Sequence, residues 1–182
     1  GQRTPTSQWT ATAAGAVVLA KNGDGPYITH VTPGRIRDKG IKDANNMGAA
    51  MAWAAYDTIS QHLKDTNRSS SFYDLIVTGD LGKLGMEIVI DLFAADGIEL
   101  RGNYNDCGIM LFDLEGQDVH CGASGCGCAA SVLTGYLLNG MREGKWNNLL
   151  FCATGALHSP TSLGQGESIP GICHAVAIST QK

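Results

Sequence analysis

The sequence predicts an α/β protein of three layers, in which a mixed, mostly parallel sheet lies between two layers of helices. Two observations predict this fold class. Short apolar runs alternate with longer segments of helical composition, a pattern typical of parallel strands joined by crossover helices. The chain also has 182 residues, 43% of them hydrophobic, which is enough for one domain with a sizeable core. The predicted order is β-β-α-β-α-β-α-β-β within a single domain, residues 1–182.

The first part of the chain predicts two strands separated by a turn. Residues 9–21 are rich in Ala, Thr and Val and predict a strand, and residues 27–32 predict the next one. Between them, Asn22-Gly23-Asp24-Gly25 is a strong turn signal. Residues 32–46 are expected to be irregular.

The middle of the chain predicts two helices around a buried strand. Residues 47–64 carry an apolar stripe at helical spacing: Met47, Met51, Ala54, Ala55, Ile59 and Leu63. A polar linker over residues 66–71 precedes a short apolar strand over residues 74–78. The chain then turns, and residues 83–95 predict the second helix.

The last part predicts a strand, a third helix and two closing strands. The strands are expected over residues 107–112, 148–153 and 172–178, and the helix over residues 124–142. The first half of this helix, residues 125–131, has no charged or bulky side chain. Such a helix is normally buried, and its small side chains let another backbone approach closely. We therefore expect it to lie between two layers of protein.

Composition excludes several classes of protein. The net charge of −4 without a basic cluster argues against a nucleic-acid surface. No apolar run approaches the ~20 residues of a membrane span, and the polar residues 2–10 predict no signal peptide. The six cysteines are expected to be free thiols in a reducing, cytosolic-type compartment. They are Cys107, Cys121, Cys126, Cys128, Cys152 and Cys173.

Three segments are candidates for ligand binding. The amides of Ser124, Gly125 and Cys126, at the start of the third helix, could receive a carboxylate; alternatively, the glycines only permit close packing. Thr154, Gly155 and Ala156 end a strand, where Gly155 would let a flat ring approach, or they form a plain turn. Ser159, Gln165 and Glu167 lie on the following loop, which either lines the pocket or is solvated.

Two further groups of residues have competing interpretations. Asp80 follows a buried strand and would repel a dianionic ligand unless a cation or proton intervenes; alternatively, it caps the helix from Leu81. His120, Cys121, Cys126 and Cys128 fit no common zinc-finger spacing, so no metal site and no cofactor is predicted. The cysteines are interpreted as small buried residues, with a reactive thiol at the helix start as the alternative.

Several runs resemble known proteins. Residues 15–19 resemble the strand that ends the amino-terminal half of thiolases and ketoacyl synthases, and Gly122-Ala123-Ser124-Gly125 resembles the tail of the thiolase motif G-H-P-x-G-x-S-G. Residues 43–51, 74–81, 153–157, 159–161 and 165–172 are similar to one branch, the stage V sporulation protein AD family. The resemblance implies that residues 1–182 form the carboxy-terminal half of a two-half, thiolase-like protein whose amino-terminal half is absent from this chain.

The resemblance also implies a function. The family binds dipicolinic acid, a pyridine dicarboxylate, and supports its uptake into the developing spore with other proteins of the same operon. The pocket takes the place of the thiolase active site. The expected location is the forespore or spore, peripheral on the inner membrane.

The resemblance predicts that catalysis is lost. Val119 stands at the thiolase histidine position, with His120 one residue away, and Gly79-Asp80-Leu81-Gly82 replaces the His-Gln-Ala-Asn stretch of the synthases. Thioester chemistry needs a base and oxyanion donors, so binding without turnover is favoured. Two alternatives stay open: a divergent acyl-CoA condensing or thiolytic enzyme with His120 as base, and an interaction module for membrane-bound spore partners. We also expect a homodimer through the helix that begins near Ser124.

Overall fold

The structure is a computed structural model that describes residues 2–100 and 102–182. Its centre is a five-stranded sheet in the order β2-β7-β6-β3-β4. The strands are β2 (Tyr27–Thr32), β3 (Leu75–Thr78), β4 (Tyr104–Asp106), β6 (Asn148–Ala156) and β7 (Gly171–Ser179). β3 pairs in parallel with β4 and β6, whereas β7 pairs antiparallel with β6 and β2. Since only β7 runs opposite to the others, the predicted mixed, mostly parallel sheet is confirmed.

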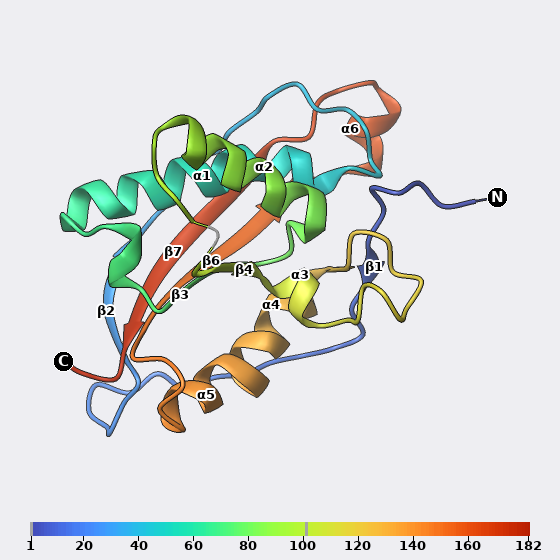
Figure 1. The fold of residues 1–182 in the computed structure, drawn as a ribbon. Helices are drawn as coiled ribbons and strands as arrows, with labels where there is room; N and C mark the ends of the chain where they lie inside the picture. The colour runs from blue at the N-terminus through green and yellow to red at the C-terminus, as the bar shows by residue number, and fades with distance from the viewer. Residues whose placement is uncertain (1, 101) are drawn as a thin grey trace.

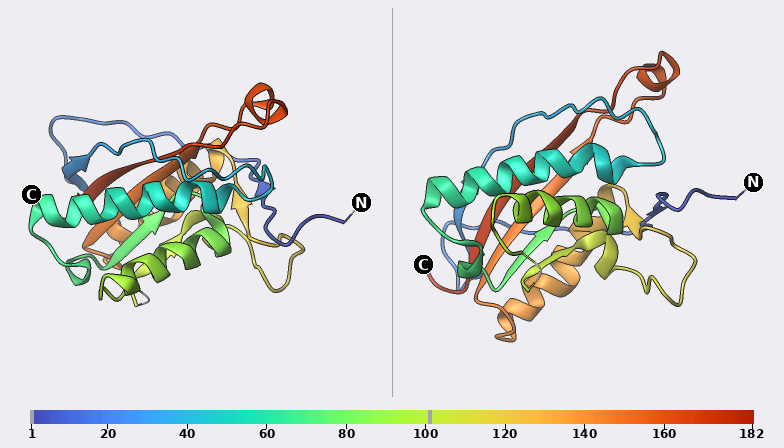
Figure 2. Two further views of the ribbon diagram at one scale, coloured as in Figure 1. Left: turned by 90° about the horizontal axis from the view of Figure 1, so that it is seen from above. Right: turned by 45° about the horizontal axis from the view of Figure 1, so that its top comes forward.

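Helices cover both faces of this sheet (Figures 1 and 2). α1 (Met47–Thr66) and α2 (Gly82–Ala95) pack on one face. On the other face lie α3 (Cys107–Met110), α4 (Cys126–Val132), a π-helical turn (Leu133–Leu137) and α5 (Leu138–Arg142). Each face has its own apolar cluster, so the α/β class with three layers is confirmed.

α1 follows the predicted stripe and has defined ends. The side chain of Asn46 accepts a hydrogen bond from the Ala49 amide at 3.3 Å, which satisfies one free donor of the first turn. Asn67 ends the helix in the left-handed conformation. The start of α1 packs closely on the start of α2. A Cβ added at Gly48 would lie only 2.2 Å from the Leu81 carbonyl oxygen.

The helical segment that begins at Cys126 lies between the sheet and an extended arm, residues 11–20. Gly127 and Cys128 are buried, and an added Cβ at Gly127 would lie 2.0 Å from the Ala13 carbonyl oxygen. Gly15 approaches the Ala130 carbonyl in the same way. The expected close approach of a second backbone is confirmed, and in this chain the arm provides it.

The arm differs from the strand predicted over residues 9–21. Only β1 (Trp9–Thr10) is a strand, and it pairs in parallel with β5 (Ala123–Ser124), away from the central sheet. Residues 12–20 are exposed and have no strand partner. Composition favours an extended backbone, but a strand also needs a neighbour to receive its hydrogen bonds.

The strand predicted over residues 107–112 is also wrong. β4 ends at Asp106, whose carboxylate accepts a hydrogen bond from the Gly108 amide at 2.9 Å and caps α3. The helix predicted from residue 124 starts at Cys126, because Ser124 belongs to β5. Two short helices interrupt segments that we expected to be irregular: a 3-10 turn (Ser70–Phe72) and α6 (Pro160–Gly164). Within the described part of the chain, no helix combines the length and apolarity needed to cross a lipid bilayer.

Candidate functional site

A cavity of about 500 Å³ lies where the end of β6 faces α1 and α4. It brings together six of the predicted binding residues, from three separate segments of the chain: Asp80, Gly125, Cys126, Thr154, Gly155 and Ala156. Its other walls are apolar: Met47, Met51, Ala129, Ala130, Leu133, Phe151 and Ala153. The volume falls within the range of small-molecule sites.

Asp80 joins the three segments that meet at this cavity. Its carboxylate accepts hydrogen bonds from the Ser124 hydroxyl and the Gly125 amide, both at 3.0 Å. It also accepts one from the Thr154 hydroxyl at 2.9 Å, and the Asp80 amide donates back to that hydroxyl oxygen at 3.0 Å. Asp80 is only 8% exposed, so this network is mostly shielded from water.

The network changes the interpretation of the turn before α4. We expected the amides of Ser124, Gly125 and Cys126 to receive a ligand carboxylate, but the carboxylate of Asp80 already takes the Gly125 amide. Ser124 is buried and donates its hydroxyl to the same carboxylate. An amide that already has an acceptor has little to gain from a second one.

The alternative role of Asp80, as the cap of the helix from Leu81, is wrong. Asp106 has that role: its carboxylate accepts from the amides of Leu81 and Gly82, both at 2.9 Å, and from the Thr78 hydroxyl at 2.6 Å. Burial raises the pKa of Asp106 to about 7, against the lowering effect of these donors. Sequence reasoning missed this residue, although an Asp directly before Cys107-Gly108 is a helix-start signal.

Gly155 leaves part of the cavity wall open. A Cβ added there would meet only the Ile172 methyl group, at 3.6 Å, which is ordinary van der Waals contact. Gly79 differs, because its Cβ would lie 2.5 Å from the Thr154 hydroxyl oxygen. The fold therefore requires glycine at position 79 but not at position 155. The glycine at 155 instead adds free space to the cavity.

The predicted residues beyond β6 do not join the site. Ser159 caps α6 by accepting a hydrogen bond from the Ser162 amide at 3.4 Å. Gln165 and Glu167 are exposed, and the Glu167 amide donates to the Ser162 carbonyl. A local helix thus turns this loop away from the cavity lining, so the structure does not bring these three residues to this cavity.

The candidate reactive groups are divided between the cavity and the core. All six cysteines are free thiols, and Cys126 is the exposed one. Burial raises the pKa of the Cys128 thiol to about 12 and that of Cys107 further still. His120 lies on the loop before β5, where its Nε2 is 3.1 Å from a carboxylate oxygen of Asp118. It does not line the cavity among the residues described.

Comparisons with known proteins give the family. The family model described as stage V sporulation protein AD matches residues 1–179. Stage V sporulation protein AD of Bacillus subtilis (strain 168) is 45% identical over 176 residues, which cover 97% of this chain and 52% of that protein. The chain thus spans about half the length of this curated relative.

Among solved structures, 3-oxoacyl-[acyl-carrier-protein] synthase III from Aquifex aeolicus VF5 is similar with a TM-score of 0.42 and 14% sequence identity. That match covers 82% of this chain and 51% of the synthase. The family model and the curated relative show that the chain belongs to the stage V sporulation protein AD family, whose members are sporulation proteins with a spore-related location.

Proposed function

We propose that this chain contributes a binding site for dipicolinic acid and performs no acyl-transfer chemistry. In this proposal it supports uptake of the ligand into the developing spore, together with other proteins of the same operon and peripheral to the inner membrane. The observation that carries the proposal is the cavity of about 500 Å³ at the end of β6. Family membership supports the connection to sporulation.

The shape of the cavity suits a flat aromatic ligand. Phe151, Ala153 and Gly155 alternate with other residues along β6, so they share the sheet face that carries α4. With a hydrogen at position 155 and small side chains on α4, a ring can lie against the strand end. Met47 and Met51 of α1 close the far side with flexible side chains.

The charge of the cavity sets a condition on the ligand. Among the described residues that line it, Asp80 is the one charged group, and no Lys, Arg or His is present. A dianion beside this carboxylate would be repelled. The ligand therefore binds with one carboxyl protonated, or as a chelate in which a divalent cation neutralises its charge.

The nucleophile and base candidates support binding without turnover. Cys126 is exposed at the cavity, but the candidate base His120 is held near Asp118 outside the described lining. A carboxylate cannot donate to a developing oxyanion, and the Asp80 carboxylate already accepts three hydrogen bonds. A thiol is activated by a nearby base, a positive charge or a helix N-terminus. Cys126 has only the last of these, at the start of the seven-residue α4.

Calorimetric titration of dipicolinate tests the proposal, once in metal-free buffer and once with equimolar Ca²⁺. Saturable heat is expected in at least one buffer, with weaker heat for picolinate, which has one carboxyl group. Gly155→Val should fill the cavity and weaken binding about tenfold or more, a loss of ~1.4 kcal/mol or greater. If neither buffer gives saturable heat, the proposal fails.

We also propose self-association through the surface beside α4 and the arm. Val17 on the arm is 52% exposed and Tyr136 is 45% exposed. Burial of such apolar groups favours a homodimer. Sedimentation analysis is expected to show a dimer that Val17→Asp weakens; a monomer at all concentrations would contradict this.

A further inference from the structure

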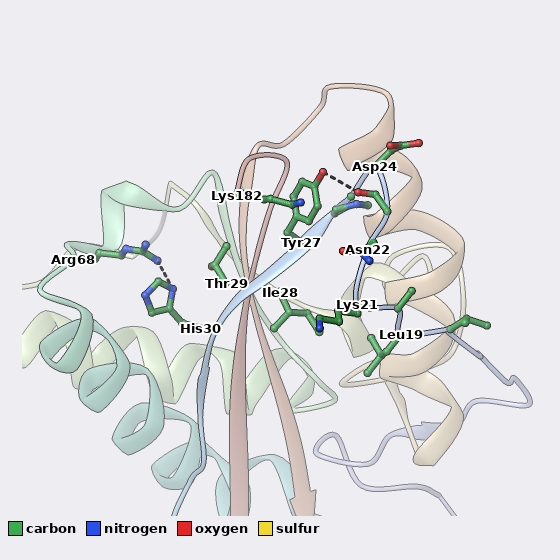
Figure 3. Close-up of a pocket in the computed structure, with 15 residues that line it drawn as sticks. Leu19, Lys21, Asn22, Asp24, Tyr27, Ile28, Thr29, His30, Arg68 and Lys182 are labelled. Carbon is green, nitrogen blue, oxygen red and sulfur yellow. Dashed lines mark hydrogen bonds between the residues drawn. The ribbon is translucent and has the colours of Figure 1, made fainter.

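A second cavity, of about 770 Å³, lies at the start of β2 (Figure 3). There Tyr27 pairs with Ser179, which pairs in turn with Asn148 at the start of β6, so this cavity is at the opposite end of the sheet from the β6 site. The arm and the turn after it, residues 18–26, form one wall, and β2 forms the floor. Arg68, after α1, and Lys182 complete the lining. We call this cavity the basic cleft.

The basic cleft concentrates positive charge in an acidic protein. Lys21, Arg68 and Lys182 all line it, whereas Asp24 is the one acidic side chain among its described lining residues. The whole chain, in contrast, has 13 Lys and Arg against 17 Asp and Glu. Within residues 2–100 and 102–182, none of these three cations takes part in an ion pair. These cations are therefore free to pair with an anionic ligand.

Arg68 is positioned by partners that carry no negative charge. Its guanidinium donates to the Tyr73 hydroxyl at 3.2 Å, contacts the His30 ring at 3.4 Å and lies 4.2 Å above the Phe72 ring. These contacts fix the orientation of the guanidinium without cancelling its charge. Arginine held in this way is suited to bind carboxylate or phosphate oxygens.

Lys182 lies further along the same strand, and Lys21 lies beside Ile28. The Lys182 amino group is 5.1 Å from the centre of the Tyr27 ring, and Figure 3 shows it beside that ring, while Arg68 meets His30. Tyr27 and His30 are three positions apart, roughly 10 Å along a strand. A ligand that uses both ends of the cleft must therefore carry more than one anionic group.

A smaller cavity continues the cleft and supplies polar groups. It has a volume of about 270 Å³ and shares Thr29, Arg68 and Lys182 with the basic cleft. Asn148, Ser179 and Gln181 also line it, and they bring amide and hydroxyl donors. No carboxylate side chain is present among its described lining residues.

We propose that the basic cleft binds a polyvalent oxyanion, a molecule with two or more phosphate groups. The groups would contact Arg68 at one end and Lys182 and Lys21 at the other. This site is separate from the β6 cavity and does not depend on the function proposed for it. The phosphates can come from a soluble oligophosphate or from lipid headgroups at a bilayer surface.

Titrations with tripolyphosphate and with inorganic phosphate in metal-free, low-salt buffer test the proposal. Tripolyphosphate is expected to bind at least about tenfold more tightly than phosphate, and the binding should weaken with added salt. The double variant Lys21→Gln/Lys182→Gln and the single variant Arg68→Gln should each weaken it roughly tenfold. The control Lys42→Gln/Lys83→Gln removes two exposed lysines outside the cleft and should leave it unchanged. Thermal unfolding of each variant checks that it is folded.

A second experiment measures sedimentation of the protein with phosphatidylcholine vesicles that contain or lack phosphatidylglycerol. The wild type and the control Lys42→Gln/Lys83→Gln should then bind only to the anionic vesicles, and the cleft variants should not bind. This outcome would support the proposal with lipid as the phosphate source. If neither tripolyphosphate nor anionic vesicles bind, or if the control variant weakens binding as much as the cleft variants, the proposal is overturned.

Discussion

Asp80 and Thr154 are joined across the site by two hydrogen bonds, although 74 positions separate them in the sequence. The Thr154 hydroxyl donates to the Asp80 carboxylate at 2.9 Å, and the same oxygen accepts from the Asp80 amide at 3.0 Å. This pair fixes the end of β6 against the turn after β3. It places a carboxylate beside the space where the ligand is proposed to bind.

Replacing Asp80 by Asn is expected to tighten dipicolinate binding about tenfold in metal-free buffer, because it removes the repulsion of the dianion. With Ca²⁺ present the gain should shrink, since the chelate is no longer repelled. Calorimetry of both proteins measures this. Thr154→Ser, which keeps the hydroxyl, is the control. Equal affinity of wild type and variant in metal-free buffer would show that Asp80 does not face the ligand.

A matched pair of alanine substitutions separates the fold from the site. Gly79→Ala should destabilise the protein by about 1–3 kcal/mol, because its Cβ would lie 2.5 Å from the Thr154 hydroxyl oxygen. Gly155→Ala should change the free energy of unfolding by less than about 0.5 kcal/mol. Denaturant unfolding measures both. A large loss of stability in Gly155→Ala would mean that the strand end needs that glycine for folding.

His62 is expected to make stability fall in mild acid. Its ring is buried between the hydroxyls of Thr32 and Tyr73, at 2.7 and 2.6 Å, and burial lowers its pKa from 6.5 to about 4. Between these two pKa values, His62 is protonated in the unfolded chain but not in the folded one. The contribution of neutral His62 to the free energy of unfolding is complete above pH 6.5 and is lost as pH falls toward 4.

Between pH 7 and pH 5 the wild type should therefore lose about 2 kcal/mol more stability than His62→Gln. Urea unfolding at a series of pH values measures the difference. Parallel pH profiles for the two proteins would contradict the predicted effect of burial.

Gly127→Ala is expected to displace the arm from α4. The added methyl would lie 2.0 Å from the Ala13 carbonyl oxygen, so the arm must move, at a cost of about 1–3 kcal/mol. Limited proteolysis should then cut residues 12–20 faster than in the wild type. Gly135→Ala is the control, because its methyl meets nothing within 4 Å. Equal cutting rates in both variants would argue against the close contact.

Incubation with acetyl-CoA is expected to leave the mass of the protein unchanged, because no His or Lys lies beside the exposed Cys126 thiol among the described lining residues, and the Asp80 carboxylate already accepts three hydrogen bonds. Intact-mass spectrometry measures this. An acetyl adduct that disappears in Cys126→Ser would favour the acyl-transfer alternative over binding alone.

The sequence by itself determined the local elements and the family. The stripe of α1, the buried strand β3 and the closing strands were predicted within a few residues, because periodicity and burial act along the chain. The resemblance identified the family that the comparisons then showed. The predicted strand ends and helix start also selected Thr154, Gly155, Ala156, Gly125, Cys126 and Asp80, which the fold brings to one cavity.

Only the tertiary structure decided how these residues pair. Three features depend on partners that are distant in the sequence. Asp80 accepts a hydrogen bond from the Gly125 amide, Asp106 caps α2, and residues 12–20 lie over α4 without a strand partner. The basic cleft likewise joins Lys21, Arg68 and Lys182 from separate parts of the chain. Hydrogen bonds and charges act through space, so their partners become known only once the backbone is folded.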